Sequence, residues 1–385
     1  MGIPKSWDFP PTIWWVDTVA VAERLRRELL AVGHRGLDLC AFFDGAREVL
    51  DRYVPFSGCC WMTFDPATIL PTSHVPWQSI RPEDVPRLAQ NEYAEEDVNK
   101  FSALAQTREH VGILSEATNG DRDASVRYSV ILRPNGFEDE MRAALTDEGA
   151  CWGGIAMYRR GEHPDFTPEE RAAIAAVTRV LAEGVRRAVL TSAIAADASP
   201  EAPGLVLLDG SDTVDAVTPA AEQWLEELVT IDEFDQLGLI HAIASQARRA
   251  GRIEANEAAR ARTRTRSGRW LVLHGSLVDG DPEGRVAVII EPARAPEIAP
   301  LIAMAYGLTP RERDVARLVI QGLPTAEIAK QLFVSAHTVQ DHLKSIFAKI
   351  GVRTRRELVT QVFADHYAPR MQAGVPVGVD GWFAR

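Results

Sequence analysis

Apolar side chains recur three or four positions apart over residues 16–33 and again over residues 36–51. This period is typical of amphipathic helices, so two helices are predicted at the start of the chain. Residues rich in β-formers follow. The run GCCWMTFDP (58–66) predicts a strand, whereas LPTSHVP (70–76) predicts a turn because it contains two prolines.

The pattern continues to change between helix and strand up to about residue 192. It predicts a helix over about 81–105, a strand over 125–132 (SVRYSVIL), a helix near 137–146 and a strand over 151–159 (CWGGIAMYR). Thr167, Pro168 and Glu170 then form a capping-box signature, which predicts the start of a long helix. Helices that flank an antiparallel sheet indicate an α+β domain over residues 10–192.

A second, smaller α+β domain is predicted over residues 200–294, after a linker at 196–204 (ADASPEAPG). It contains a strand (LVLLD), two helices, and two strands (RWLVLHGSLV and RVAVIIEP) joined by DGDPEG. Before the last two strands, Arg260, Arg262, Arg264 and Arg266 alternate, so in a strand all four would share one face. That face would bind an anion or the DNA backbone, or it would be a solvated edge strand whose charges block aggregation.

The C-terminal part of the chain is predicted to be helical throughout. The motif LTPRE (308–312) marks a capping box at the start of one helix, and Gly322 ends that helix. A second helix begins at Thr325, and a third runs from Ser335 to Gly351. Two short helices, a tight turn and a capped third helix form the helix-turn-helix arrangement, which places its recognition helix in the major groove of DNA.

The third of these helices separates apolar from polar residues. Its inward stripe comprises Val339, Leu343, Ile346 and Ile350. Gln340, Asp341 and Lys344 project together from the opposite face, where they are predicted to read base edges.

Charge is distributed unevenly along the chain. The whole chain has 42 basic and 54 acidic residues and a formal net charge of −12. Residues 308–366 carry nine basic and six acidic side chains, a net charge of +3, which leaves −15 on the remainder. Attraction to phosphate is therefore concentrated in the C-terminal unit, while the acidic body discourages indiscriminate coating of DNA.

From LTPRE to KIGV (349–352), the C-terminal unit resembles the LuxR-type helix-turn-helix of actinobacterial regulators. The shared positions are LTPRE, Gly322, EIA (327–329), S-x-x-TV (335–339), His342 and KIGV. The resemblance implies an all-α, four-helix DNA-binding domain over residues 305–367, whose last helix, about 354–366, commonly serves dimerisation. Family members often have Lys or Arg where this chain has Gln340, and Gly where it has Phe333.

All expected DNA contacts lie in this unit. They are Ser335, His337, Thr338, Gln340, Asp341, Lys344, Lys349, Arg353 and Arg355. The segment 368–385, rich in Gly, Val and Pro, is predicted to be a flexible tail.

The first unit resembles the GAF domain of actinobacterial LuxR-type regulators. The similarity lies in CWMTFDPATILPTSHVP, QNEYAEEDVNKFSALA, RPNGFEDEMR and CWGGIAMYRRGEHPDFTPEE. It implies a module that senses a ligand or another signal. The middle unit looks like a degenerate PAS-type domain, through GLVLLDGSDTVDAVTPAAEQWLEEL and SGRWLVLHGSL.

Five residues of the first unit are candidates for a ligand site. They are Trp61, Phe64, Trp77, Arg127 and Trp152. The aromatic side chains would line a pocket for a planar molecule or, alternatively, belong to the core. Arg127, together with Asp139, Glu140 and Arg142, would orient a ligand or form a set of structural ion pairs.

The cysteines also have two interpretations. Cys59 and Cys60 are adjacent in a predicted strand, so they face opposite sides and cannot readily bridge each other, but one of them could meet Cys151 on a neighbouring strand. Such a pair would make a redox sensor; otherwise these are small buried thiols.

Sequence motifs of catalysis are missing. No CxxC pair, GxSxG, HExxH or Walker motif occurs, so no enzyme activity, metal or cofactor is predicted. The N-terminal residues lack a signal-peptide pattern and no apolar run approaches the length of a membrane span, so a cytoplasmic protein without a membrane partner is expected.

These features predict a homodimeric transcription regulator that binds double-stranded DNA through its C-terminal unit. The N-terminal unit is expected to respond to a small-molecule effector or another signal, and to change how the dimer sits on two half-sites. One alternative is a thiol-based redox sensor or GAF-type enzyme fused to a DNA-binding domain. Another is a constitutive DNA-binding protein whose N-terminal units only dimerise.

Overall fold

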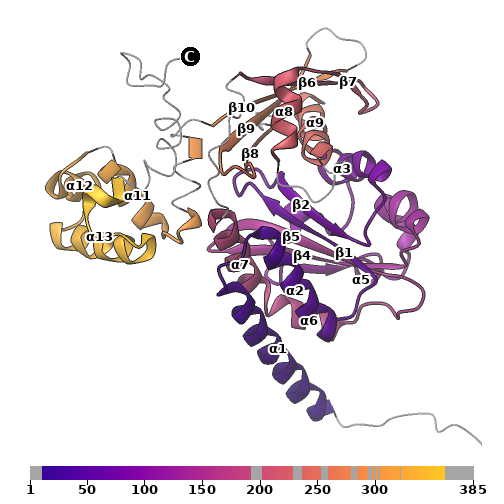
Figure 1. Cartoon of the computed structure of the whole chain (residues 1–385). Helices are drawn as coiled ribbons and strands as arrows, with labels where there is room; N and C mark the ends of the chain where they lie inside the picture. The colour runs from indigo at the N-terminus through magenta and orange to yellow at the C-terminus, as the bar shows by residue number, and fades with distance from the viewer. Residues whose placement is uncertain are drawn as a thin grey trace, which may run out of the picture.

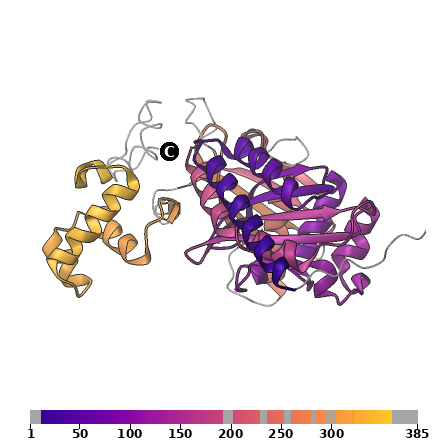
Figure 2. The same cartoon turned by 90° about the horizontal axis from the view of Figure 1, so that it is seen from below.

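The computed structural model describes residues 11–191, 202–228, 236–252, 259–278, 284–293, 297–298, 301, 304–320 and 322–359. These residues form two five-stranded antiparallel sheets with helices packed against them, and a helical unit at the carboxyl end (Figure 1 and Figure 2). Within these ranges, no helix has both the length and the apolar character needed to cross a membrane.

The first unit begins with two helices, α1 (Pro11–Gly33) and α2 (Leu39–Tyr53), where the apolar period predicts them. Its strands are β1 (Gly58–Phe64), β2 (Pro71–Trp77), β3 (Val111–Ile113), β4 (Asp139–Asp147) and β5 (Ala150–Arg159), paired in the order β2-β1-β5-β4-β3. Between β2 and β4 lie α3 (Val85–Ala94), α4 (Phe101–Leu104), α5 (Leu114–Ala117) and a π-helical turn, η3 (Tyr128–Leu132). The unit ends with α6 (Pro168–Ala175) and α7 (Thr178–Thr191).

The first sheet is buried on both faces because the residues of β1 alternate between two cores. Cys59 and Trp61 point to the face covered by α1, α2 and α7, where Trp61 stacks on Phe43 with ring centroids 4.9 Å apart. Cys60 points to the other face, against which α4, α5 and η3 pack. A strand buried on both faces has no polar side, which explains the continuous apolar sequence of β5, predicted correctly as a strand.

Two predicted elements of the first unit are wrong. Of residues 125–132, predicted as a strand, 126–132 are helical, and the buried side chains Arg127, Tyr128, Ile131 and Leu132 follow a helical spacing. Residues 137–146, predicted as a helix, contain β4, which is buried along almost its whole length. The charged residues of β4 obscured this pattern because they are buried as ion pairs inside the unit.

The predicted turn at residues 70–76 is instead β2. Its two prolines are tolerated because β2 lies at the edge of the sheet and pairs only with β1. The capping box at Thr167 is confirmed, since the side chains of Thr167 and Glu170 each accept the backbone N–H of the other. The helix that it starts is divided into α6 and α7.

The second unit repeats the topology of the first. Its strands are β6 (Gly204–Leu208), β7 (Val214–Val217), β8 (Arg260–Arg264), β9 (Trp270–Leu277) and β10 (Val286–Pro292), paired in the order β7-β6-β10-β9-β8. Its helices α8 (Pro219–Glu226) and α9 (Gln236–Arg252) pack on one face of this sheet. Counted from the first strand of each, both sheets follow the order 2-1-5-4-3. The sequences show no such repeat.

Strand β8 joins the two units. Arg262 donates from Nε to Asp65 Oδ2 at 2.8 Å and from Nη2 to Asp65 Oδ1 at 2.6 Å. Thr263 Oγ1 donates to the carbonyl of Thr72 at 2.6 Å, and Arg264 donates to a carbonyl at the end of α7 at 2.9 Å. Because Asp65 is 2% exposed, its pair with Arg262 is a buried, bidentate ion pair.

Strand β8 lies at the edge of its sheet, as the second interpretation expects, but its arginines bind the protein itself instead of facing solvent. Arg260 donates to Glu297 Oε1 at 2.6 Å, and Arg262 Nη1 donates to the Glu297 carbonyl at 2.9 Å. Of the four arginines, Arg266 is the exposed one. The strand thus binds both the first unit and the segment that leads to the C-terminal unit.

The C-terminal unit contains α11 (Pro310–Ile320), α12 (Thr325–Gln331) and α13 (Ala336–Ile350) around one apolar core. These helices match the predicted ones, and Gly351 ends α13 in the left-handed conformation with φ 80°. Helical backbone resumes at Arg355 and continues to Val359. Residues 360–366 of the predicted fourth helix, the tail at 368–385 and most of the linker at 196–204 lie outside the described residues.

A buried carboxylate holds α11 against α13. Glu312 is 4% exposed and accepts hydrogen bonds from Lys349 Nζ at 2.7 Å, from the Ser345 hydroxyl, and from the Thr309 N–H at 2.8 Å. The last bond completes the predicted capping box. Burial alone would raise the pKa of the Glu312 carboxyl, but the donated hydrogen bonds outweigh it and lower this pKa to about 2.

We expect Arg262→Ala to destabilise the junction of the two units by about 3–5 kcal/mol, because it removes the only counter-charge that the structure describes at the buried Asp65 carboxylate and leaves the backbone N–H groups of Ala67 and position 262 as its donors. The measurement is thermal unfolding combined with hydrogen exchange of the β8 amides. Arg266→Ala is the matched control, since Arg266 is exposed, and should change stability by less than about 0.5 kcal/mol. Equal effects of the two substitutions would contradict a stabilising role of the Asp65–Arg262 ion pair at the junction.

Glu312→Gln should lower the stability of the C-terminal unit at neutral pH by about 1.5–3 kcal/mol, because the carboxylate accepts charge-assisted hydrogen bonds. The pKa of Glu312 is depressed in the folded state, so its contribution is present above about pH 4.5 and is lost as the pH falls toward about 2. Hydrogen exchange of the α13 amides from pH 7 down to about pH 3 should show a weaker pH dependence in the variant. Glu327→Gln, an exposed change on α12, should behave like the unaltered protein.

Candidate functional site

The helix-turn-helix presents α13 with its amino end capped and open. Ser335 caps the helix by accepting the Thr338 N–H at 3.0 Å, and the two hydroxyls lie 2.8 Å apart. Val339, Leu343 and Ile346 are buried in the core of the unit. The polar residues between them therefore face away from the protein.

The exposed face of α13 is centred on Asp341. One carboxylate oxygen lies 3.7 Å from His337 Nδ1 and the other lies 3.9 Å from Lys344 Nζ. The side chains of His337 and Lys344 are 79% and 78% exposed, and Gln340 beside them is also exposed. These loose contacts leave the hydrogen-bonding groups available, so four of the predicted residues share one accessible surface.

The three basic residues predicted after this surface differ in their surroundings. Lys349 is bound to Glu312, and Arg355 donates to the Leu323 carbonyl at 2.6 Å. Arg353 is exposed, and its guanidinium forms no ion pair within the part of the chain that the structure describes. The donors of Lys349 and Arg355 are thus largely used inside the unit, whereas those of Arg353 face solvent.

The turn before α13 has an unusual residue. Phe333 is 95% exposed and has a positive φ of 53°. A left-handed backbone favours glycine, which gives a physical reason for the glycine that the resemblance places at this position. The turn therefore keeps its backbone geometry despite a bulky side chain.

The aromatic residues proposed for a ligand site lie elsewhere. Trp61 and Trp152 belong to the core between the first sheet and its helices, and Phe64 packs against Phe101 with ring centroids 5.2 Å apart. The ring of Trp77 lies under the Arg47 guanidinium at 4.7 Å. Trp61, Trp152 and Phe64 are therefore core residues, which is the second interpretation of the aromatic set. Trp77 makes an ordinary cation–π contact.

The charged candidates form a buried network. Arg127 is fully buried and donates from Nε to Glu140 at 2.9 Å, while Arg142 donates from Nη1 to Glu92 at 2.8 Å. Asp139 accepts hydrogen bonds from Ser115 and from a backbone N–H. Arg127, Glu140 and Arg142 thus form structural ion pairs, as the second interpretation has it, whereas Asp139 is held by hydrogen bonds.

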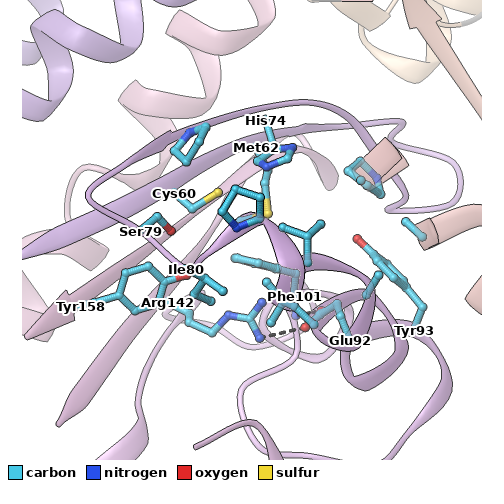
Figure 3. Close-up of a pocket in the computed structure, with 18 residues that line it drawn as sticks. Cys60, Met62, His74, Ser79, Ile80, Glu92, Tyr93, Phe101, Arg142 and Tyr158 are labelled. Carbon is cyan, nitrogen blue, oxygen red and sulfur yellow. Dashed lines mark hydrogen bonds and ion pairs between the residues drawn. The ribbon is translucent and has the colours of Figure 1, made fainter. Parts of the chain in front are cut away.

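An apolar cavity of about 110 Å³ lies on the Cys60 face of the first sheet, and the five predicted ligand residues are not among those that line it (Figure 3). Its lining includes Cys60, Met62, Arg142 and Tyr158 from the sheet. Sequence reasoning missed the cavity because its walls come from segments far apart in the chain.

Cys59, Cys60 and Cys151 are free, buried thiols, as one interpretation has it, and the alternative pairing of Cys59 or Cys60 with Cys151 is wrong. On β5, Cys59 lies opposite Met157 and Cys60 lies opposite Ala156, so Cys151 is at least five residues away, or about 16 Å at the rise of a strand. Burial raises the pKa of the Cys59 and Cys151 thiols to about 12, so neither is a thiolate at neutral pH. Among the described residues, no group of three or more His, Cys, Asp or Glu is placed to hold a metal ion.

The similarity of this chain to known proteins is concentrated in the C-terminal unit. The family described as "Bacterial regulatory proteins, luxR family" matches residues 307–362. The chain is 56% identical over 54 residues to a putative HTH-type transcriptional regulator of Mycobacterium bovis, a match that covers 14% of this chain and 6% of that protein. The nitrate/nitrite response regulator NarL of Escherichia coli is 42% identical over 55 residues, which are 14% of this chain and 26% of NarL.

The similarity to solved structures is weaker. A bacteriophytochrome from R. palustris aligns with 75% of this chain and 64% of its own, at 14% identity and a TM-score of 0.28. A TM-score this low does not identify the fold of the first two units. Their resemblance to GAF and PAS domains therefore stays a prediction.

A short relative shows the family of the C-terminal unit. Spore germination protein GerE of Bacillus subtilis is 42% identical over 55 residues, which are 14% of this chain and 74% of GerE. The matched residues include the capped α13 and its exposed face. The chain belongs to the luxR family of bacterial regulatory proteins, with the family's DNA-binding helix-turn-helix at residues 307–362.

Proposed function

We propose that this protein is a sequence-specific transcription regulator that reads DNA with the outer face of α13. The observation that carries the proposal is that Gln340, Asp341 and Lys344 are exposed together opposite a buried apolar stripe. A recognition helix needs this division, because one face must hold the helix in place while the other enters the major groove.

Each of these side chains matches a different base. The Gln340 amide both donates and accepts, as adenine requires, and the Lys344 ammonium donates to the O6 and N7 acceptors of guanine. The Asp341 carboxylate accepts from the N4 amine of cytosine. In the free protein Asp341 lies between His337 and Lys344 in loose contacts, which DNA can replace.

Other groups are proposed to bind the phosphate backbone of the DNA. Arg353 is exposed just beyond the end of α13 and is free to bind a phosphate, whereas Lys349 and Arg355 contribute to packing. Ser335 and Thr338 at the amino end of α13 offer hydroxyls and the helix N-terminus to a second phosphate. Contacts of this kind set the register on DNA without selecting its sequence.

The remainder of the chain, residues 10–192 and 200–294, is proposed to regulate the DNA-binding unit at 305–367. Support comes from β8, whose arginines bind both Asp65 in the first unit and Glu297 on the way to the DNA-binding unit. Two copies of the chain would occupy half-sites about one helical turn apart. A signal then acts by favouring one arrangement of the two copies.

Lys344→Ala should weaken binding to the preferred sequence by about 1–3 kcal/mol and relax the preference at one base pair. The preferred sequence is first obtained by selecting random duplexes with the purified full-length protein, and affinities are then measured by fluorescence anisotropy on single-base variants. Lys330→Ala, an exposed lysine on α12, should leave base preference unchanged. A uniform loss on all sequences would reassign Lys344 to a phosphate.

Arg353→Ala should lower the slope of log affinity against log salt by about one unit, because one phosphate contact is lost, with little change in base preference. The measurement is the same titration repeated over a range of salt concentrations. Arg311→Ala, on the amino-terminal turn of α11, serves as the comparison, since that guanidinium already binds the Leu332 carbonyl and Asp314. An unchanged slope for Arg353→Ala would refute the phosphate contact.

A further inference from the structure

The cavity on the Cys60 face of the first sheet is bounded on one side by a helix of the second unit. Most of its lining belongs to the first unit, from β1, β2, α3, β4 and β5. The last wall is α9, which contributes Gly238 and Ala242, one helical turn apart and therefore on the same side of the helix. Figure 3 shows the labelled side chains of the first unit converging on this space.

The size of the cavity limits what it holds. At about 110 Å³ it is smaller than an apolar cavity of about 150 Å³ that takes benzene in another protein, and far below the 300–1,000 Å³ of pockets for drug-sized ligands. A nucleotide or a polycyclic cofactor would not fit without rearrangement. A molecule of about six to eight heavy atoms fits with small side-chain adjustments.

The charges in the lining are already paired. Glu92 accepts from Arg142 at 2.8 Å with one carboxylate oxygen and from the Phe101 N–H at 2.9 Å with the other. The Arg142 guanidinium also lies 3.9 Å over the Phe101 ring. Burial lowers the pKa of His74 to about 4, so this lining imidazole is neutral at pH 7. A charged guest would thus enter an apolar space without an unpaired counter-ion.

The approach of α9 to the first unit is unusually close. A Cβ placed on Gly238 would lie 3.1 Å from Cε1 of His74 on β2, a distance at which the neighbour must yield. The helix is therefore held against β2 at the point where it covers the cavity. Any guest in the cavity contacts residues of both units, so its binding free energy depends on how α9 is docked.

We propose that this cavity binds a neutral molecule of single-ring size and that α9 of the second unit is part of the binding site, so that occupancy strengthens the docking of the two units. The regulatory part of this inference rests on the function proposed above. The seam that the guest stabilises is the one crossed by Asp65 and Arg262, and β8 continues it to Glu297. Occupancy is thereby connected to the segment that leads to the DNA-binding unit.

The test uses phenol as a neutral probe and benzoate as an anionic one, with benzamide, which is neutral and as large as benzoate, as the control for size, and it uses the full-length protein. Phenol should bind, as measured by ligand-observed NMR and calorimetry, and benzoate should bind at least about tenfold more weakly because its charge is not compensated. Hydrogen exchange of the α9 amides should slow in the presence of phenol. No binding of phenol, or equal binding of benzoate, overturns the proposed ligand class.

Two variants of α9 test whether the second unit belongs to the site. Ala242→Leu fills the cavity from the α9 side and should weaken phenol binding by about tenfold or more. Ala250→Leu, further along α9 at a partly exposed position, should leave phenol affinity unchanged. Equal binding to Ala242→Leu and the unaltered protein would remove α9 from the site. If Ala242→Leu does not fold, unchanged exchange of α9 in phenol-saturated unaltered protein would equally remove α9 from the site.

The DNA measurements separate this inference from the proposed function. A protein that binds phenol with slower α9 exchange but selects no DNA sequence would refute the proposed function and keep the shared site. A protein that selects DNA but binds no phenol would refute the shared site and keep the function. Phenol that binds at α9 and leaves DNA affinity unchanged in the full chain would refute the regulatory link alone.

Discussion

The ion pair between Asp65 and Arg262 fixes β8 against the first sheet, beside the packing of α3 against α9 that also joins the two α+β units. A carboxylate that is 2% exposed is costly to leave alone, so separation of the units must either hydrate Asp65 or leave it unpaired. The pair has two parallel hydrogen bonds, which fix the direction of β8 as well as its distance from β1. Since α9 and β8 belong to the same unit, this pair also holds the wall of the cavity in place.

A second buried carboxylate has the corresponding role in the DNA-binding unit. Glu312 begins α11 and binds Ser345 and Lys349 on α13, so the recognition helix is oriented by a polar contact as well as by apolar packing. Apolar contacts alone permit a helix to rotate by small angles, whereas a hydrogen bond to a fixed carboxylate does not. The outward direction of Gln340 and Lys344 follows from this constraint. It also explains why Lys349, a basic residue near the DNA-binding surface, binds Glu312 and is not left for DNA.

The sequence predicts the elements whose signals are local. The helical period over residues 16–33, the capping boxes at Thr167 and Thr309, and the Gly351 stop all depend on residues within a few positions of one another, and the structure contains each of them. Residues 125–132 and 137–146 were predicted as a strand and a helix, the reverse of what the structure contains, for a different reason. Glu140 and Arg142 are polar in sequence but buried, because their partners come from the residue before η3 and from α3, which a local window does not include.

The DNA-reading surface of α13 and the cavity of the first unit also differ in whether their sequence signals are local. The DNA-reading surface was accessible to sequence reasoning because both its faces belong to one helix, and the apolar stripe identifies the polar one. The cavity depends on which face of the first sheet is incompletely filled. Alternation along β1 shows that Trp61 and Cys60 point in opposite directions, but it does not tell which direction leads to a void. Aromatic size favoured Trp61 and Trp152, and large rings are the side chains that fill space most completely. Trp152 and Phe64 line a smaller space of about 40 Å³, whereas the cavity of about 110 Å³ lies beside Cys60 and Met62, where α9 approaches from another unit.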